Sequence, residues 1–276
     1  MHEILENFGP GLCVLDLGSG PGSFDASFDA NSLPFIAIRV DLDPPSGPAA
    51  NFAQARFVQT NAARLPFADR TFDALISNHN LEHFHDLAGS LAEIGRVLKP
   101  TGALYIAVPD ASTFCDRFYR WLTRGGGHVN AFTSAEELAA SVERATGLPH
   151  VNTRILLASL SYLHPANLGA TSPRRVLLFG SGGPLFLHLF TYFARLSDWL
   201  LGTRFSVYGW ALYFGRFPVP IETEVWSNVC IRCGSGTQSH WLRYRNLVRK
   251  RLFWRIYRCP TCGTSNLFFE DRHYQR

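Results

Sequence analysis

The most constraining feature of this sequence is a glycine-rich turn that directly follows an apolar run. Residues 12–17 (LCVLDL) form a continuous run around Asp16, and Gly18, Gly20 and Gly22 follow at alternate positions. This pattern predicts a buried parallel strand, a tight turn and the start of a helix. Glycines at such a turn let the backbone pass close beneath a ligand and leave amide groups unblocked. We therefore expect a ligand at this end of the strand.

A carboxylate lies at the end of the next apolar run. Residues 35–40 predict a second strand, and Asp41 follows Gly22 by 19 residues. A carboxylate at the carboxyl end of a strand can accept hydrogen bonds from both hydroxyls of a ribose. The third glycine comes one residue too early for the dinucleotide fingerprint, where Ser23 stands instead. The glycines and Asp41 together favour a nucleoside ligand over a purely structural turn.

Apolar runs alternate with helical patterns through the first 150 residues. The expected strands are residues 12–17, 35–40, 56–60, 72–77 and 103–108, and the expected helices are residues 86–98 and 134–146. The second helix opens on a capping box formed by Ser134 and Glu137. Such alternation predicts a parallel sheet with helices on both faces. The fold class expected for this half is α/β, doubly wound.

Four segments in consecutive order carry a family resemblance over about residues 10–150. They are VLDLGSGPG, VDLDP, FVQTNAARLPFADRTFDALISNHNLEH and LAEIGRVLKPTGALYIAVPD. Together they resemble the class I S-adenosylmethionine-dependent methyltransferases of the type 11 group. The resemblance implies a Rossmann-like seven-stranded sheet of order 3-2-1-4-5-7-6, in which strand 7 is antiparallel. It also implies that the cofactor lies across the carboxyl ends of strands 1, 2 and 4.

The same resemblance assigns cofactor contacts to individual positions. Those that would face the methionine part are Asp16, Gly18, Ser19, Gly20, Gly22 and Asn78. Those that would face the ribose and the adenine are Asp41, Leu42, Asn61 and Ala62. Position 61 is Asn where relatives usually have Asp, so its oxygen can still accept a bond from the adenine amine, without the charge. Relatives often carry further helices before the first strand that close the substrate pocket, so we expect either that the sequence starts late or that residues 159–220 cover the pocket.

Methyl transfer from a sulfonium is an in-line displacement in which the protein mainly supplies alignment and water exclusion. A hydroxyl acceptor also needs its proton removed, usually by His or a carboxylate. The loops at the carboxyl edge offer His79, His83, His85 and His128. The resemblance favours His79 and His128 as the catalytic pair, while we expect His83 to be structural. The segment after the fourth strand lacks the Asn/Asp-Pro-Pro-aromatic tetrapeptide, which disfavours methylation of exocyclic base amines.

The character of the chain changes after residue 158. Residues 176–194 carry no formal charge, but glycines and a proline at 180–184 interrupt them, so we do not expect a membrane span. We expect a helix over residues 185–201 within a helical, aromatic insertion or lid at 159–220. The alternative is a membrane-surface element through residues 176–215. Residues 221–231 predict a late antiparallel strand, which would place this insertion between the last two strands.

Four of the six cysteines form two C-x-x-C pairs. They are Cys230, Cys233, Cys259 and Cys262, and a glycine follows each second cysteine. Each pair can point two thiolates at one ion, so two pairs complete a four-thiolate zinc site. A redox dithiol would need only one pair, normally at a helix start. We therefore expect structural Zn²⁺ in a zinc-ribbon-like module.

The second half of the chain is basic and the first half acidic. Residues 1–150 hold 10 Lys+Arg against 17 Asp+Glu, and residues 151–276 hold 16 against 5. Between the two cysteine pairs, residues 243–258 interleave arginines with aromatics, which suits RNA, an anionic membrane surface, or a hairpin with a solvated Arg face. The N-terminus carries no apolar leader, so we expect a cytoplasmic protein, peripheral at a membrane in the alternative above.

We therefore expect three parts: a SAM-binding methyltransferase domain at residues 1–158, the insertion or lid at 159–220, and the last strand plus zinc-ribbon-like segment at 221–276. The leading hypothesis is methyl transfer, by O-methylation, to a small-molecule, sugar or lipid-linked (glycolipid) acceptor. An RNA methyltransferase that holds RNA with its basic ribbon is the alternative. A non-catalytic scaffold that keeps the SAM-binding fold is a second alternative.

Overall fold

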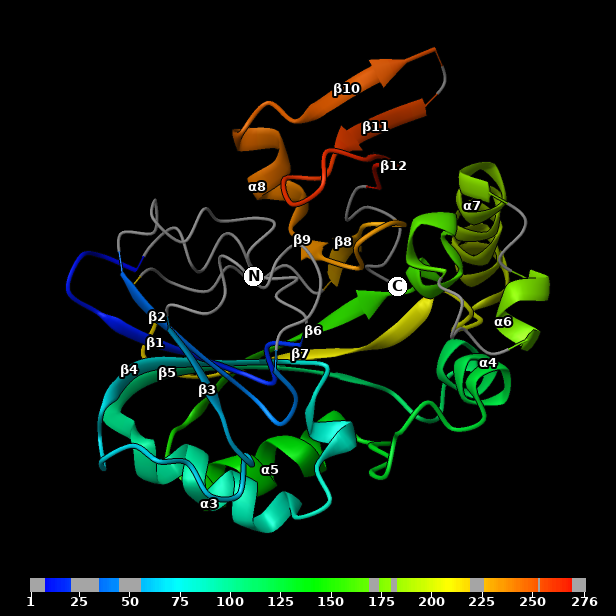
Figure 1. Ribbon diagram of the computed structural model, residues 1–276. Helices are drawn as coiled ribbons and strands as arrows, with labels where there is room; N and C mark the ends of the chain where they lie inside the picture. Colours follow the sequence, from blue (N-terminus) through cyan, green and yellow to red (C-terminus); the bar gives the residue numbers. More distant parts are fainter. Residues whose placement is uncertain are drawn as a thin grey trace.

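The computed structural model describes residues 8–20, 35–44, 56–168, 174–179, 183–218, 226–252 and 254–269. The first strands of its main sheet are β1 (Cys13–Leu17), β2 (Ile36–Asp41), β3 (Phe57–Gln59), β4 (Phe72–Asn78) and β5 (Leu98–Pro109). The remaining ones are β6 (His150–Leu157), β7 (Val207–Gly215), β8 (Trp226–Val229) and β9 (Gly236–Thr237). Their order across the sheet is β3-β2-β1-β4-β5-β7-β6-β8-β9 (Figure 1).

The first seven strands confirm the expected doubly wound order of 3-2-1-4-5-7-6. Strands β1 to β5 pair in parallel, whereas β7 is antiparallel to both β5 and β6. Neighbouring strands β1 and β4 lead away in opposite directions along the sheet, toward β2 and toward β5. Open α/β sheets bind ligands outside the carboxyl ends of the strands at such a switch point. The topology alone therefore directs attention to the ends of β1, β2 and β4.

Helices α3 (Leu87–Val97) and α5 (Ala135–Thr146) cover one face of this sheet (Figure 1). The first residue of each predicted range is the N-cap, and the helix itself begins one residue later. The Asp86 side chain accepts a hydrogen bond from the Gly89 amide, and the Ser134 hydroxyl accepts one from the Glu137 amide. Such caps satisfy backbone donors that have no partner inside the helix. Leu91, Ile94 and Val142 of these helices are buried in the core cluster under the sheet.

The antiparallel strand differs from the expected one. Residues 207–215, which belong to the aromatic run assigned to the lid, form β7 in the middle of the sheet. The segment inserted between β6 and β7 therefore ends near residue 206 rather than 220. Residues 221–225 lie outside the described residues, and Trp226–Val229 form β8, which pairs in parallel with β6. The segment VYGWALYFG shows no alternation of apolar and polar residues, because a central strand is buried on both faces and is therefore apolar throughout.

The inserted segment is helical, as expected. It contains the short turns η3 (Ser161–Leu163) and η4 (Pro165–Asn167) and the helices α6 (Arg174–Phe179) and α7 (Gly183–Leu201). The buried Asp198 carboxylate ends α7 by accepting bonds from the amides of Phe205 and Ser206 and from the Thr203 hydroxyl. This carboxylate therefore fixes the turn that leads from α7 into β7. Among the described residues, no helix is both long and apolar enough to cross a bilayer.

The C-terminal module contains helix α8 (Ser239–Tyr244) and a separate sheet. The sheet consists of β10 (Val248–Arg251), β11 (Trp254–Arg258) and β12 (Ser265–Leu267), all antiparallel (Figure 1). Its small core includes Leu242, Tyr257 and Phe268 together with two of the cysteines. The module packs on the insertion, because the Tyr192 ring of α7 lies edge-on to Trp254, with centroids 4.9 Å apart. A buried arginine of the same helix, Arg195, lies over the Phe269 ring.

Candidate active site and metal centre

The glycine turn sits between the ends of β1 and β2. The amides of Gly18 and Ser19 both donate to the Val40 carbonyl, at 2.8 and 3.0 Å. Gly18 has φ +74°, and a Cβ there would collide with the Asn80 side chain, whose amide donates to the Leu17 carbonyl at 2.8 Å. Glycine is therefore required at position 18 both for the backbone conformation and for the close approach of Asn80. Asn80 is a supporting residue that the sequence analysis did not single out.

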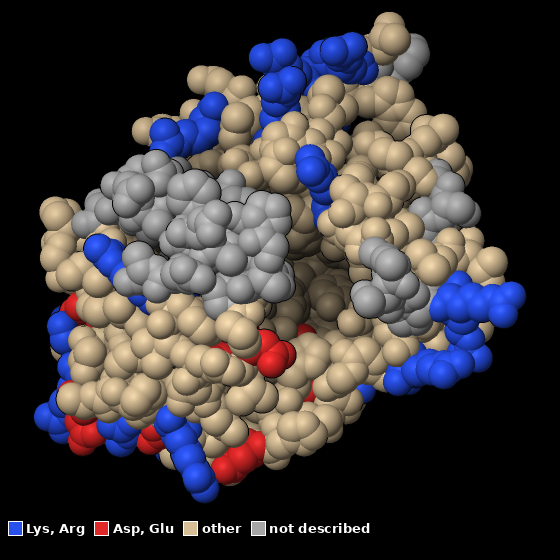
Figure 2. All heavy atoms as spheres, in the orientation of Figure 1, with Lys and Arg blue, Asp and Glu red and all other residues tan. Residues whose placement is uncertain are grey.

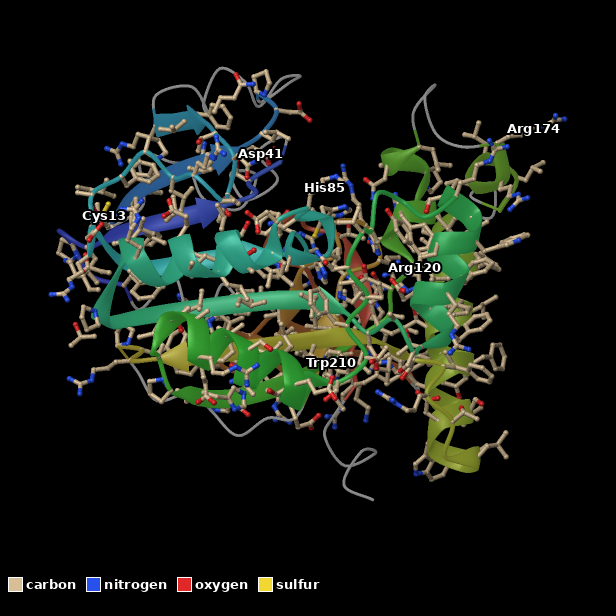
Figure 3. The ribbon with its side chains drawn as sticks, turned by 90° about the horizontal axis from the view of Figure 1, so that it is seen from below. Cys13, Asp41, His85, Arg120, Arg174 and Trp210 are labelled. Atoms are coloured by element: carbon tan, nitrogen blue, oxygen red, sulfur yellow. The ribbon has the colours of Figure 1, made fainter. Side chains whose placement is uncertain are left out.

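Asp41 lies at the carboxyl end of β2 and faces the glycine turn. Its carboxylate accepts hydrogen bonds from the Gly20 amide at 2.7 Å and from the Asp43 amide at 3.1 Å. The neighbouring Leu42 leaves 64% of its surface exposed, so an apolar platform stands at the same strand end. Figure 3 shows Cys13 at the amino ends of the strands. Asp41 lies toward the carboxyl ends, on the side where His85 and Arg120 lie. The acid and the exposed leucine are thus positioned together by one strand.

The other expected cofactor contacts surround this strand end. Asn61 is exposed just after β3 and its side-chain oxygen accepts a hydrogen bond from the Ala63 amide at 2.9 Å, while Ala62 is buried. Asn78 ends β4 and is exposed. Gly22 lies outside the described residues. The remaining positions therefore gather at the carboxyl ends of four adjacent strands.

Asp16 is a buried carboxyl group directly beneath the turn. It is 5% exposed, and its Oδ2 atom has no hydrogen-bond partner within the described part of the chain. Burial raises the pKa of Asp16 to about 7; the charge of the buried Arg39 opposes this shift, and Asp41 adds to it. A positive charge placed near this carboxyl group would lower its pKa and favour the ionised form.

A cavity of about 250 Å³ opens beside the end of β4. It brings the two predicted catalytic histidines, His79 and His128, into one site with Asn78. The other walls include Tyr119, Tyr162 and Tyr208, residues 156–161, and Cys233, Gly234 and Gly236. Figure 2 shows the molecule hollowed at the centre of this face, below the C-terminal module. The remaining loop histidine, His85, is exposed and does not line this cavity.

His79 directly follows β4 and has a strained backbone conformation. Its φ is +59°, and its amide donates to the Ala107 carbonyl of β5 at 2.9 Å. Such strain in a non-glycine residue persists only where the surrounding structure holds it, and it is found most often at functional sites. Burial, together with the nearby His128 and His83, lowers the pKa of His79 to about 4. The ring is therefore neutral at neutral pH and can accept a proton.

His128 is held by a carboxylate on α4 (Phe114–Thr123). Its Nδ1 atom lies 3.5 Å from Asp116 Oδ1, and Asp116 in turn accepts a bond from Arg120 Nε at 2.6 Å. Although burial acts to raise it, hydrogen bonds from His128 and Arg120 hold the pKa of Asp116 below its usual range. The His128 side chain is only 3% exposed. The Asp116–His128 pair therefore has a fixed orientation toward the cavity.

Sequence reasoning missed several residues of this cavity. Glu82 of the short turn η2 (Leu81–His83) is 1% exposed, and its Oε1 atom lies 3.8 Å from His79 Nδ1. Burial raises the pKa of Glu82 to about 8. Its only sequence signal was its position inside Leu-Glu-His. No sequence signal connected Asp116 to the site. It lies on α4, and its contact with His128 depends on how the chain folds back after the Gly125–Gly127 run.

The four cysteines converge on one point. The Sγ atoms of Cys230 and Cys262 lie 3.6 Å apart, as do those of Cys233 and Cys259, and all four lie within 4.8 Å of one another. A tetrahedral four-thiolate zinc site with Zn–S of about 2.3 Å has edges of about 3.8 Å. The two loops are alike, since the Gly234 amide bonds to the Cys230 carbonyl and the Gly263 amide bonds to the Cys259 carbonyl. The geometry thus fits the expected zinc ligands.

Comparisons with known proteins agree with this fold. Residues 15–106, which span β1 to β5, match the family model of the methyltransferase domain. An uncharacterized methyltransferase of Mycobacterium sp. (strain JLS) is 31% identical over 137 residues, or 49% of this chain and 50% of that protein. A demethylmenaquinone methyltransferase of Corynebacterium kroppenstedtii is 28% identical over 185 residues, or 60% of this chain and 78% of that protein. The chain thus spans about half the length of the mycobacterial relative.

Solved structures share the fold at low sequence identity. The YcgJ protein of Bacillus subtilis superposes with a TM-score of 0.51 at 22% identity, covering 78% of this chain and 99% of that one. A SAM-dependent methyltransferase of Archaeoglobus fulgidus gives a TM-score of 0.50 at 16% identity, covering 78% and 90%. These likenesses concern the arrangement of the main sheet and its helices.

Proposed function

We propose that this chain, whose residues 15–106 form a methyltransferase domain, is an S-adenosylmethionine-dependent methyltransferase. In our proposal the methyl group passes to an oxygen atom of a small-molecule, sugar or lipid-linked acceptor. One observation supports the proposal. The cavity with His79 begins at Asn78, the last residue of β4, and β4 pairs directly with β1, whose carboxyl end carries the glycine turn.

The residues at the strand ends fit the cofactor. The apolar face of Leu42 suits an adenine ring, and the Asp41 carboxylate suits the ribose hydroxyls, which would replace the Gly20 amide as its partner. Asn61 offers an oxygen to the adenine amine, as the resemblance implies. The turn at 18–22 together with Asp16 and Asn78 would hold the methionine part. The bound cofactor supplies a methyl group activated by a positively charged sulfur.

The cavity supplies the acceptor side of the reaction. His79 is neutral at neutral pH and takes the proton that an acceptor hydroxyl loses. The new carbon–oxygen bond forms as the carbon–sulfur bond breaks, and the electron pair of that bond stays on sulfur. The tyrosines and backbone that enclose the cavity exclude water from this exchange. His128, held by Asp116, is the second proton acceptor that this geometry allows.

Calorimetry with S-adenosylmethionine and with its demethylated product tests the enzyme class. We expect one site per chain and at least a tenfold loss of affinity for Asp41→Ala, because two charge-assisted hydrogen bonds to the ribose are removed. Asp43→Ala is the matched control, since Asp43 is exposed and donates only its amide to Asp41. Absence of heat for the wild-type chain, or an unchanged affinity in Asp41→Ala, would refute the cofactor assignment and favour the scaffold alternative.

A lipid-linked acceptor is favoured by an apolar groove outside the cavity. The groove measures about 380 Å³ and lies between α4 and α7; its lining residues are Phe114, Phe190, Phe193, Ala194, Ser197 and Phe205. Three of these phenylalanines are themselves exposed, which is costly unless they contact another apolar molecule. The groove suits an alkyl or prenyl chain. The Corynebacterium relative, named as a demethylmenaquinone methyltransferase, is a precedent for methyl transfer in this family.

RNA is the acceptor in our second candidate function. Arg249, Lys250 and Arg251 of β10 are exposed, as are Arg255 and Arg258 of β11. Figure 2 shows Lys and Arg gathered over this hairpin at the top of the molecule. Cations beside exposed aromatics such as Trp254, which is 46% exposed, suit phosphates and stacked bases. Binding to RNA that weakens steeply with salt would favour this candidate over the lipid-linked acceptor.

A further inference from the structure

Three side chains on the cavity wall form a cluster, and two of them, Glu82 and His83, have no part in the proposed methyl transfer. Glu82, His83 and His128 each offer one ligand atom, and these atoms lie within 4.8 Å of one another. Glu82 and His83 come from the turn after β4, whereas His128 comes from the loop after α4. The backbone joins the two segments, because the amides of Val129 and Asn130 both donate to the Glu82 carbonyl, at 2.8 and 3.0 Å.

The carboxylate of this cluster lacks a full set of partners. Glu82 is buried, and its Oε2 atom has no hydrogen-bond partner among the residues that the structure describes. Its Oε1 atom lies 3.8 Å from His79 Nδ1, beyond hydrogen-bond distance. A buried carboxyl oxygen without a hydrogen-bond partner is unfavourable, because it has lost its water ligands without replacement. A cation bound at this point would supply the missing partner.

Both histidines are oriented as metal ligands usually are. His83 Nδ1 lies 3.0 Å from the Gly127 carbonyl oxygen, and His128 Nδ1 lies 3.5 Å from Asp116 Oδ1. In metal sites one ring nitrogen of each histidine is typically held by a carbonyl or carboxylate, which leaves the other nitrogen for the ion. The two rings stand edge-on to each other with centroids 4.9 Å apart. Each histidine offers one ring nitrogen to the cluster.

We propose that Glu82, His83 and His128 bind one divalent transition-metal ion inside the acceptor cavity. Two imidazoles and one carboxylate are the donor set that suits Mn²⁺, Fe²⁺, Co²⁺ or Zn²⁺, and they leave open coordination positions. All three residues line the cavity, so these positions face the acceptor. The acceptor class that fits carries two adjacent oxygen atoms, such as a vicinal diol or a hydroxy-carbonyl group. An ion here lowers the pKa of a hydroxyl beside it.

The role of the ion in catalysis rests on the proposed function, but its binding does not. The ion site is also separate from the cysteine centre in its chemistry, since thiolates prefer softer ions than a carboxylate and two imidazoles do. Mn²⁺ is therefore the probe that reports the new site without competing at the four cysteines.

The test uses the full chain with its cysteines loaded with zinc, and it measures Mn²⁺ binding by electron paramagnetic resonance. We expect one Mn²⁺ per chain. His83→Ala and His128→Ala should each weaken binding about tenfold or more, and Glu82→Gln should do the same while keeping the shape of the side chain. His85→Ala is the matched control, because His85 is exposed two residues beyond His83 and outside the cavity; its affinity should equal that of the wild type.

Absence of bound Mn²⁺ at millimolar concentration would overturn the proposal, as would equal affinity in His83→Ala and wild type. His83 is exposed, so its variant is expected to fold, and circular dichroism on each variant checks this. Calorimetry with S-adenosylmethionine on the same samples separates the two claims. If the chain binds the cofactor but no Mn²⁺, the proposed ion site is refuted and the proposed function is not. If it binds Mn²⁺ but no cofactor, the proposed function is refuted and the ion site is not.

Discussion

At the scale of single residues, burial determines which groups can react. His79 is partly buried and the neighbouring Glu82 fully buried, yet burial shifts their pKa values in opposite directions, to about 4 and about 8. The reason is that burial disfavours the charged form of each group, which is the protonated histidine and the ionised glutamate. Both groups are thus neutral near pH 7. These two side chains therefore add no fixed charge to the cavity.

Asp16 makes the free energy of unfolding depend on pH. Its folded-state pKa is about 7 against an ordinary value of 3.8, so its contribution to stability is fully present below pH 4 and is lost as the pH rises to 7. The loss amounts to at most about 4 kcal/mol, from roughly three pKa units. Denaturant titrations at pH 5 and pH 7.5 should show a smaller pH effect in Asp16→Asn than in wild type. An identical pH effect in both would show that Asp16 is ionised in the folded protein.

At the scale of secondary-structure elements, the sequence predicted those whose signals are local. The glycine turn, the strand ending at Asp41 and the two capped helices lie where the patterns placed them, because caps and strand-end turns depend on neighbouring residues. The prediction that residues 221–231 form the antiparallel strand was wrong. Residues 207–215 form it instead, and their apolar run gave no clear signal because a central strand and a buried helix can both be continuously apolar. The contact between Asp116 and His128 was unpredictable for another reason. It depends on how α4 packs, and no local pattern encodes that.

The cysteine loops give a prediction at the same scale. We expect the purified chain to contain about one zinc ion, and Cys230→Ser to lose it, because three thiolates hold zinc much less tightly than four. Cys230 also belongs to the small core with Tyr257, so the C-terminal module should unfold at lower denaturant concentration. Elemental analysis and limited proteolysis measure the two effects. Cys13→Ser, outside the cluster, should keep its zinc; equal zinc content in both variants would argue against this site.

At the scale of the whole molecule, the exposed apolar residues are unevenly distributed. Much of the large exposed apolar surface lies on α6 and α7, where Leu178, Leu185 and Leu201 are each about 70% exposed or more. Arg174 and Arg175 begin α6 next to this surface, and Arg174 lies at its outer end (Figure 3). Apolar side chains bordered by arginines suit an anionic lipid surface. This pattern belongs to no single helix.

We therefore expect the chain to co-sediment with vesicles that contain anionic lipid and to bind neutral vesicles less. The double change Leu200→Glu and Leu201→Glu should reduce binding at least tenfold, because it replaces two exposed apolar side chains with like charges facing the lipid. Val151→Glu on β6, also an exposed apolar position, is the control and should bind as wild type. Loss of binding only when the arginines of β10 are changed would instead assign the surface contact to the C-terminal module.

The first cysteine loop forms part of the cavity wall as well as half of the cysteine cluster. Cys233, Gly234 and Gly236 line the acceptor cavity, and a side chain at Gly234 would press on the Ser161 hydroxyl, 3.1 Å from its Cβ. Ile231 is buried with Leu160 and Leu163 of the insertion, and the Arg232 carbonyl accepts a bond from the Asn167 side chain. A chain cut before this loop would therefore lack part of the cavity wall. The shape and size of the cavity thus depend on a module that lies outside the seven-stranded core of the main sheet.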